Sequence, residues 1–350
     1  KKELIFLQSI GPRLGGLLTK DIGELKRIFL SPGPIFDPED RMDDYWGYTE
    51  AFYSVGFRPG DVVQVTFNYH LSPAGLMFEE PLRNLGCASI PAGPTDPGTQ
   101  LDIMQKLRVS GYVGTASYLM HLAQKAEEKG INLRKDLFQE VAFVTGERLS
   151  EKMRNQLEKK FDIILRQGYG TADVGCIGYE CFHKTGLHIS NRCYVEICHP
   201  DTGIPLKDGE VGEIVVTSFN KTYPLIRLAT GDLSYIDRAP CACGRTSPRL
   251  GSIVGRVDTT ARIKGMFVYP HQVEQVMARF EDIKRWQIEV INPGGIDEMI
   301  LYVEASNFHQ EDELLHLFRE RIKLRPELKV LAPGTLPPQI KPIEDKREWD

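Results

Sequence analysis

Short apolar runs alternate with amphipathic segments along the first half of the chain. The apolar runs predict buried strands, and apolar residues at helical spacing between them predict helices. Strands are expected at 27–30, 61–69, 87–90, 111–114, 141–144 and 161–165, and helices at 40–55, 73–85, 99–109, 118–129 and 150–159. Because strand and helix follow each other in turn, the pattern predicts a parallel sheet with helices on its faces, an α/β fold.

The pattern changes in the second half. Hairpin signals at 201–203 and 207–209 precede a strand at 213–217, which indicates a β-rich subdomain. After Pro270 we expect a helix to Phe280, strands at 286–291 and 299–303, a helix at 311–323 and a strand near 329–331. We therefore expect two domains, a large one over 1–257 and a small α+β one over 258–350.

Composition narrows the function classes. The chain has 350 residues, a formal charge of −5, 41% hydrophobic and 26% charged residues, which is ordinary for a soluble globular protein. The negative charge argues against nucleic-acid binding, which favours an excess of basic residues. The apolar runs are too short to span a bilayer, and the first residues do not have the pattern of a signal peptide. A cytoplasmic enzyme or binding protein is the expectation.

A glycine-rich hexapeptide, Gly168 to Asp173, follows the apolar run at 161–165. We expect a Gly-Tyr-Gly turn at the carboxyl end of a strand, the edge at which ligands bind in open α/β sheets. Thr171 and Asp173 offer a hydroxyl beside a carboxylate, a pair that suits a phosphate with Mg²⁺. A purely structural turn is the alternative.

Seven cysteines, an odd number, indicate reduced thiols rather than a disulfide framework. Thiol and imidazole side chains gather in two segments: Cys176, Cys181, His183, His188, Cys193, Cys241 and Cys243. Structural zinc takes four such ligands, and the set that we favour is Cys181, His188, Cys241 and Cys243. Buried reduced cysteines without a metal are the alternative.

Several motifs follow the hexapeptide in a fixed order. They are Pro224–Arg227 leading to Thr230-Gly-Asp232, then Pro240-Cys-Ala-Cys-Gly-Arg-Thr246, and then Gly255 through Pro270 with Lys264-Gly265 inside it. From about Arg27 to the carboxyl end the chain resembles the adenylate-forming superfamily and, within it, the phenylacetate–CoA ligase family. The resemblance implies ATP, Mg²⁺, CoA and an aryl or acyl carboxylic acid as ligands, and it is compatible with a homodimer.

The resemblance also implies roles for individual residues. Asp173 would bind Mg²⁺ and Thr171 would touch phosphate, Asp232 would accept both ribose hydroxyls, Asp258 would be the hinge of a mobile lid, and Lys341, with Lys346 as the competitor, would neutralise the α-phosphate. The remaining nucleotide-binding positions would be Gly146, Glu147, Tyr169, Gly170, Arg256 and Lys264.

The chain departs from the family pattern at one loop above all. Ser31 to Pro38 occupies the position of the phosphate loop but carries three prolines and no following lysine, so it is either a rigid turn or a remodelled phosphate loop. Ala172 stands at the hydroxyl position of the family motif. The family also carries several dozen residues before this start, so we expect a shortened amino end.

Three functions stay open. The first is an acyl- or aryl-CoA ligase working through an acyl-adenylate. The second is a nucleotide- or adenylate-binding protein without ligase activity, and the third is an adenylating enzyme with another thiol acceptor.

Overall fold

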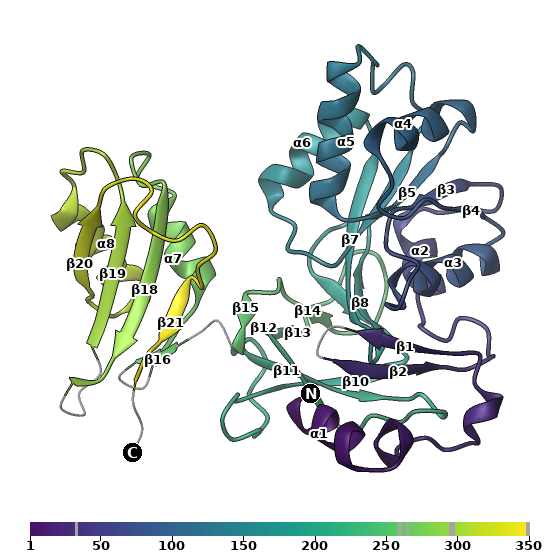
Figure 1. Cartoon of the computed structure of the whole chain (residues 1–350), viewed down its shortest axis with the longest axis horizontal. Coiled ribbons are helices and arrows are strands. Elements are labelled where there is room, and N and C mark those ends of the chain that lie inside the picture. The colour runs from purple at the N-terminus through teal and green to yellow at the C-terminus, as the bar shows by residue number, and fades with distance from the viewer. Residues whose placement is uncertain (32–33, 258–260, 264–265, 294–297, 348–350) are drawn as a thin grey trace. The chain divides into compact units, whose positions relative to one another are not determined.

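The computed structural model describes residues 1–31, 34–257, 261–263, 266–293 and 298–347, and the chain divides into two compact units (Figure 1). The first unit comprises Lys1–His199, Gly203–Thr230 and Tyr235–Ser252. The second comprises Pro200–Thr202, Gly231–Ser234 and Ile253–Asp350. No helix in the described ranges is long and apolar enough to cross a membrane.

A nine-stranded sheet organises the first unit, in the order β13-β14-β9-β8-β7-β6-β5-β3-β4. Its parallel half contains β3 (Val62–Val65), β4 (Ala88–Pro91), β5 (Gly111–Gly114), β6 (Val141–Val144) and the start of β7 (Ile164–Thr171). Its antiparallel half continues through β8 (Gly175–Glu180), β9 (Leu187–Ile189), β14 (Arg249–Leu250) and β13 (Ile236–Asp237). The predicted parallel sheet is therefore one half of a mixed sheet.

Helices cover both faces of the parallel half. They are α2 (Thr49–Val55), α3 (Ala74–Asn84), α4 (Pro97–Lys106), α5 (Ala116–Glu128) and α6 (Glu151–Phe161) (Figure 1). On β6 the alternate residues Val141 and Phe143 pack in the hydrophobic cluster that contains α2 and α3 residues, whereas Ala142 and Val144 pack in the cluster of α4, α5 and α6. Alternation of side chains along a strand thus divides one apolar run between two cores.

The predicted helix over 40–55 is too long, because α2 begins only at Thr49. Asp44 adopts a left-handed φ of 49°, and Gly47 one of 72°. The Asp44 carboxylate accepts hydrogen bonds from the Tyr48 and Thr49 backbone amides, at 2.9 and 3.2 Å. Side chains that bond nearby backbone amides in this way favour turns over helix interiors, and here the turn delays the helix.

The predicted turn at Gly-Tyr-Gly is also misplaced. β7 runs through these residues to Thr171 and pairs antiparallel with β8, with a register shift between Tyr169 and Gly170. A side chain on Gly170 would collide with the hydroxyl of Tyr48 and the carbonyl of Gly175, so the glycine permits a close approach of protein groups. The turn comes four residues later, at Ala172 to Val174.

Smaller elements complete the first unit. β1 (Arg27–Ser31) and β2 (Ile35–Glu39) form an antiparallel hairpin, and β10 (Cys193–Cys198) pairs with β11 (Gly212–Ser218). The amino-terminal segment contains α1 (Lys2–Ile10) and 3₁₀ turns at Arg13–Gly16 and Ile22–Glu24. The described part of the candidate phosphate loop therefore belongs to a hairpin, with Ser31 at the end of β1 and residues 35–38 on β2.

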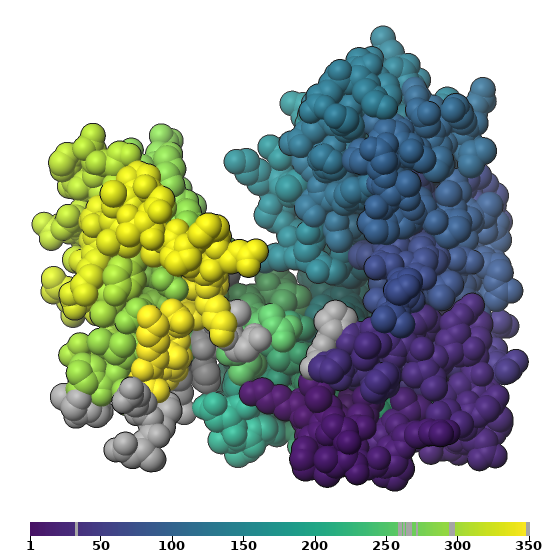
Figure 2. Space-filling view, viewed as in Figure 1, coloured from purple at the N-terminus to yellow at the C-terminus, as the bar shows by residue number. Residues whose placement is uncertain are grey.

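The second unit has its own sheet, in the order β20-β19-β18-β21. The strands are β18 (Arg285–Ile291), β19 (Glu298–Glu304), β20 (Glu327–Leu331) and β21 (Ile343–Asp345), packed with α7 (Pro270–Met277) and α8 (Glu311–Ile322). The short strands β16 (Ala261–Ile263) and β17 (Met266–Val268) pair with each other. Of these helices and strands of the second unit, all but β16, β17 and β21 were predicted from the sequence. Figure 2 shows the yellow carboxyl-terminal segment that contains β21 on the surface of this unit.

Candidate nucleotide and metal sites

Asp173 lies in the turn between β7 and β8, with its side chain almost fully buried. Its Oδ2 is 2.6 Å from the Nζ of Lys1. The Thr171 hydroxyl oxygen accepts a hydrogen bond from the Val174 amide at 3.3 Å, and this bond closes the turn. The tight turn therefore fixes both predicted residues at the end of β7, with the Asp173 carboxylate paired to an ammonium group.

Asp37 is a candidate that sequence reasoning missed. It lies on β2, is 1% exposed, and neither of its carboxylate oxygens has a hydrogen-bond partner in the described part of the chain. Burial and then the charge of Asp173 raise the pKa of Asp37 to about 7, against smaller opposing effects of Ser31 and Lys1. The available signal was an acid among the apolar residues Ile35-Phe-Asp-Pro, within the candidate phosphate loop itself.

The predicted adenine-side residues lie at the carboxyl end of β6. Gly146 has a φ of 84°, a conformation that favours glycine. Glu147 accepts hydrogen bonds from the backbone amide and the hydroxyl of Ser117, at 2.6 and 2.8 Å. Since Ser117 lies in the first turn of α5, Glu147 places a carboxylate at the positive end of that helix, where it is stabilising. Tyr169 is half-buried and Gly170 tightly packed on β7.

Asp232 and Arg256, predicted from separate motifs, are direct partners in the second unit. β12 (Leu228–Ser234) and β15 (Gly255–Arg256) pair antiparallel with Asp232 opposite Arg256. Arg256 Nη1 is 2.9 Å from Asp232 Oδ1, and the Asp232 side chain is 16% exposed. Gly231 has a φ of 83°, and a Cβ there would come within 2.9 Å of Arg256 Nη2. The turnlike Thr-Gly-Asp motif is thus a strand that presents one carboxylate beside one guanidinium.

The two candidate lysines differ in their surroundings. Lys341 is exposed just before β21, and its backbone carbonyl accepts a hydrogen bond from Gln287 at 3.2 Å. Lys346 pairs with Glu289 at 2.8 Å, and hydrogen bonding to that carboxylate raises the pKa of Lys346. Two other predicted positions, Lys264 and the hinge Asp258, lie outside the described residues.

Four thiol and imidazole groups meet at the junction of β8, β9 and the loop before β14. The ligand atoms of Cys181, His188, Cys241 and Cys243 all lie within 4.8 Å of one another. Cys181 Sγ is 3.7 Å from Cys241 Sγ, and Cys243 Sγ is 3.3 Å from His188 Nε2. These distant segments meet because β14 pairs with β9 in the same sheet, with Arg249 opposite His188.

The surroundings of this cluster suit a cation. Although burial raises it, hydrogen bonds from the Cys243 backbone and from neighbouring side chains lower the pKa of Cys241 to about 5. Burial raises the pKa of Cys181 to about 11. His188 is fully buried, and its Nδ1 lies 3.3 Å from the hydroxyl oxygen of Ser247. A partner on the second ring nitrogen is the usual arrangement for a histidine whose first nitrogen binds metal.

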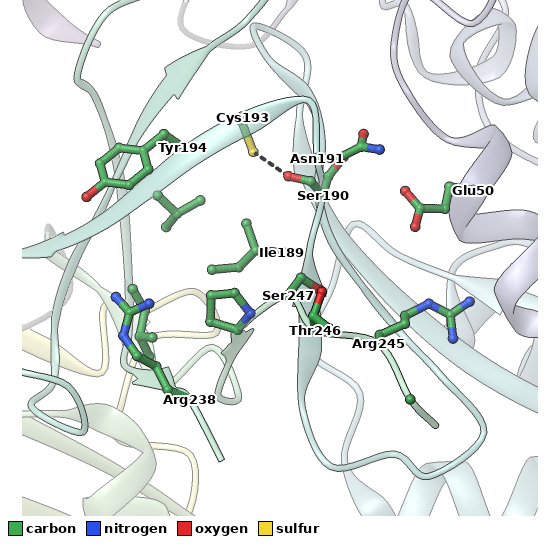
Figure 3. Close-up of a pocket in the computed structure, with 14 residues that line it drawn as sticks. Glu50, Ile189, Ser190, Asn191, Cys193, Tyr194, Arg238, Arg245, Thr246 and Ser247 are labelled. Atoms are coloured by element: carbon green, nitrogen blue, oxygen red, sulfur yellow. Dashed lines mark hydrogen bonds between the residues drawn. The ribbon is translucent and has the colours of Figure 1, made fainter. Parts of the chain in front are cut away.

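A surface cavity of about 580 Å³ adjoins the same loop (Figure 3). It is lined by the residues that follow Cys243, by the β9–β10 turn and by Arg238 and Arg245. Arg238 Nε is 2.7 Å from Asp208, and the Arg245 guanidinium lies 5.7 Å from the centre of the Tyr179 ring. Among the residues that the structure describes, no predicted nucleotide-binding position lines this cavity.

Comparison with known proteins identifies the family. A sequence model described as "AMP-binding enzyme" matches residues 46–221, and one described as "AMP-binding enzyme C-terminal domain" matches residues 265–347. Phenylacetate-coenzyme A ligase of Thermus thermophilus is 32% identical over 307 residues, 81% of this chain and 69% of that protein. The enzymes of the same name from Pseudomonas putida (30% identical; 72% of this chain, 58% of that protein) and Escherichia coli K12 (28%; 84% and 71%) also match.

Solved structures show the same fold. An open conformation of 2-hydroxyisobutyryl-CoA ligase, in complex with 2-HIB-AMP and CoA, aligns with a TM-score of 0.85 and 22% identity over 99% of this chain and 80% of that one. ATP-bound MatB from Rhodopseudomonas palustris aligns with a TM-score of 0.65 and 16% identity over 93% and 67%. The chain therefore belongs to the phenylacetate–CoA ligase family of AMP-binding, adenylate-forming enzymes, which are ATP-dependent acid–thiol ligases.

Proposed function

We propose that this chain activates an aryl or acyl carboxylic acid with ATP and transfers it to CoA. In the first step a carboxylate oxygen of the acid bonds to the α-phosphorus, and pyrophosphate leaves. In the second step the CoA thiolate bonds to the acyl carbon, and AMP leaves. Phenylacetate is the first acid to test, because three relatives carry it in their names.

The Asp232–Arg256 pair carries this proposal. A carboxylate can accept one hydrogen bond from each hydroxyl of a ribose, and a guanidinium beside it can donate to a phosphate oxygen. The 2.9 Å contact holds both groups in place before a nucleotide arrives. Such preorganisation removes part of the ordering cost of binding.

Other residues act on the phosphates and the base. Asp173, with Thr171 beside it, would offer carboxylate oxygen to Mg²⁺, which neutralises phosphate charge when bound. Lys341 would neutralise the α-phosphate, since no carboxylate in the described ranges pairs with its exposed ammonium, whereas Lys346 pairs with Glu289. Gly146, Glu147, Tyr169 and Gly170 would border the adenine, Lys264 would assist at the nucleotide, and residues 258–350 would form the lid.

Pyrophosphate release with a panel of aryl and acyl acids, ATP and CoA tests the proposal. We expect turnover with at least one acid. Asp232→Ala should weaken AMP binding by about tenfold or more, the equivalent of one charge-assisted hydrogen bond. Turnover should then be lost. The exposed Asp102, which pairs with Lys106 at the surface, provides the control Asp102→Ala. AMP binding that survives Asp232→Ala would overturn the assignment.

A second candidate function is a nucleotide-binding protein without ligase activity. It is favoured by the sequence of the candidate phosphate loop, Ser31 to Pro38, which carries three prolines and no following lysine. AMP binding without pyrophosphate release from any acid would support it. Product formation with ATP and another thiol, but not with CoA, would support an adenylating enzyme with a different acceptor.

The lysine assignment has its own test. Lys341→Ala should lower the rate of adenylation by about 10²-fold or more while AMP binding stays intact, because the charge is needed mainly as the pyrophosphate leaves. Lys346→Ala is the control, since it breaks a surface pair with Glu289. If Lys346→Ala stops adenylation and Lys341→Ala does not, the assignments must be exchanged.

We propose that the four-residue cluster of Cys181, His188, Cys241 and Cys243 holds a structural Zn²⁺. A tetrahedral zinc with Zn–S near 2.3 Å and Zn–N near 2.05 Å separates two sulfurs by about 3.8 Å and a sulfur from a nitrogen by about 3.6 Å. The observed separations of 3.7 and 3.3 Å fit these values. Four protein ligands leave no open position, which favours a structural over a catalytic ion.

Metal analysis tests this site. We expect one zinc per chain, lost with Cys241→Ser and kept with Cys87→Ser, a buried cysteine outside the cluster. Cobalt substitution should give the visible absorption of tetrahedral thiolate coordination. An absence of zinc from protein purified without chelators would contradict the proposal.

A cytoplasmic location and a homodimer also stay proposals, the latter testable by sedimentation.

A further inference from the structure

The acids at the end of β2 have unequal partners. Glu39 is paired with Lys26 at 3.3 Å and Arg27 at 2.9 Å, and Asp40 is paired with Lys20 at 2.9 Å. Asp37 is as buried as Glu39, yet both of its oxygens lack a hydrogen-bond partner within the described ranges. A buried carboxylate without a partner is destabilising by several kcal/mol. Its retention on this strand needs an explanation.

The environment of Asp37 contains a second carboxylate. Ile35, two residues before Asp37, and Val174, directly after Asp173, pack in the same hydrophobic cluster as Tyr223. Burial raises the pKa of the Tyr223 hydroxyl most, the hydrogen bond with Gln8 opposes this, and the charges of Asp37 and Asp173 both raise it further. The hairpin and the β7–β8 turn therefore bring two buried acids into one neighbourhood, where Lys1 Nζ pairs with Asp173.

We propose that Asp37 and Asp173 together hold the Mg²⁺ that accompanies the ATP phosphates. This proposal rests on the proposed function. Mg²⁺ is commonly bound by one or two carboxylates, with waters and substrate phosphate oxygens in its other positions. A divalent cation between the two acids would neutralise both buried charges, which a single lysine cannot do.

The proposal explains the departure of the phosphate loop from the family pattern. A lysine after that loop would act on phosphate directly. In this chain the same hairpin supplies the Asp37 carboxylate, which would act on the phosphates indirectly, by binding the Mg²⁺ that contacts them. The Lys1 side chain is 31% exposed, so its ammonium can leave Asp173 for solvent or a phosphate oxygen when the cation binds.

Binding of Mn²⁺, a paramagnetic substitute for Mg²⁺, tests the proposal by electron paramagnetic resonance of the full chain with ATP present. Asp37→Asn keeps the side-chain volume and should raise the Mn²⁺ dissociation constant by about tenfold or more, as loss of a metal-supporting group does. Asp173→Asn should have a similar effect. Glu39→Gln, an equally buried acid on the same strand but one with cationic partners, should change the constant by less than about twofold.

Thermal unfolding measured without metal serves as the control that shows whether a variant has misfolded. Asp37→Asn should be at least as stable as the native chain, because it removes an unpaired buried carboxylate. It should also lose the stabilisation that Mn²⁺ with ATP gives the native chain. Native-like Mn²⁺ affinity in Asp37→Asn would overturn the proposal, whether or not Asp173→Asn weakens binding.

The outcome is separable from that of the ligase proposal. Weakened Mn²⁺ binding in Asp37→Asn, in a chain that releases no pyrophosphate with any acid, would support the metal site and refute the ligase. Pyrophosphate release with an unchanged metal affinity in Asp37→Asn would support the ligase and refute the role of Asp37.

Discussion

The buried ion pair between Arg154 and Glu180 should be essential to the β7–β8 turn that carries Asp173. Arg154, on α6, is fully buried; its Nη1 and Nη2 donate to Glu180 at 2.9 and 2.6 Å. Glu180, at the end of β8, also accepts from the backbone amide and the side-chain amide of Gln167, at 2.9 and 3.0 Å. The pair thus ties a helix to both strands.

Replacing Arg154 alone should lower the free energy of unfolding much more than replacing both Arg154 and Glu180. Among the described residues, Arg154→Met leaves the buried Glu180 carboxylate with the Gln167 donors alone. Uncompensated buried charges of this kind destabilise a protein by about 3–5 kcal/mol. The double variant Arg154→Met with Glu180→Leu leaves no buried charge, and well-packed apolar replacements of ion pairs are often neutral. We therefore expect the double variant to recover at least half of the loss.

Urea unfolding followed by circular dichroism measures these changes, and hydrogen exchange of peptides from β7 and β8 localises them. Lys160→Met on the same helix is the control, because Lys160 pairs with Glu127 at the surface and such pairs contribute at most about 1 kcal/mol. The reasoning fails if Arg154→Met costs no more than this control, or if the double variant loses the sum of the two single losses.

Two further predictions concern packing and pH. Gly170→Ala should destabilise the chain by about 1–3 kcal/mol in urea unfolding, because its Cβ would meet the Tyr48 hydroxyl, whereas Gly23→Ala, with open space around it, should change stability by less than about 0.5 kcal/mol. Burial raises the pKa of Asp40, but hydrogen bonds, above all from Lys20, leave it lowered overall. Its stabilising effect is therefore present at neutral pH and lost as the pH falls through that lowered pKa, so the stability difference between the native chain and Asp40→Asn should shrink below about pH 4. A difference that stays constant between pH 7 and pH 3 would contradict this.

The sequence by itself determined the local elements and the family. Apolar spacing predicted nearly every helix and strand of the parallel half, because each element must bury one side of itself whatever its neighbours are. The order of Thr-Gly-Asp, Gly-Arg-Val-Asp and the carboxyl-terminal motifs identified the AMP-binding family. The helix expected over 40–55 begins only at Thr49, because the Asp44 carboxylate accepts hydrogen bonds from the backbone amides that follow it. Hydrophobic spacing does not record such a local interaction.

Only the tertiary structure decided which distant groups meet. The sheet carries β14 beside β9 and so brings Cys241 and Cys243 to His188. Antiparallel pairing places Arg256 opposite Asp232, whereas their motifs lie 24 residues apart in the chain. The sequence did not show that the Asp37 carboxylate is buried without a hydrogen-bond partner among the described residues, which is a property of the packed hairpin. The physical reason is that strand register and burial are set by contacts across the whole unit, while propensity and periodicity act over a few neighbouring residues.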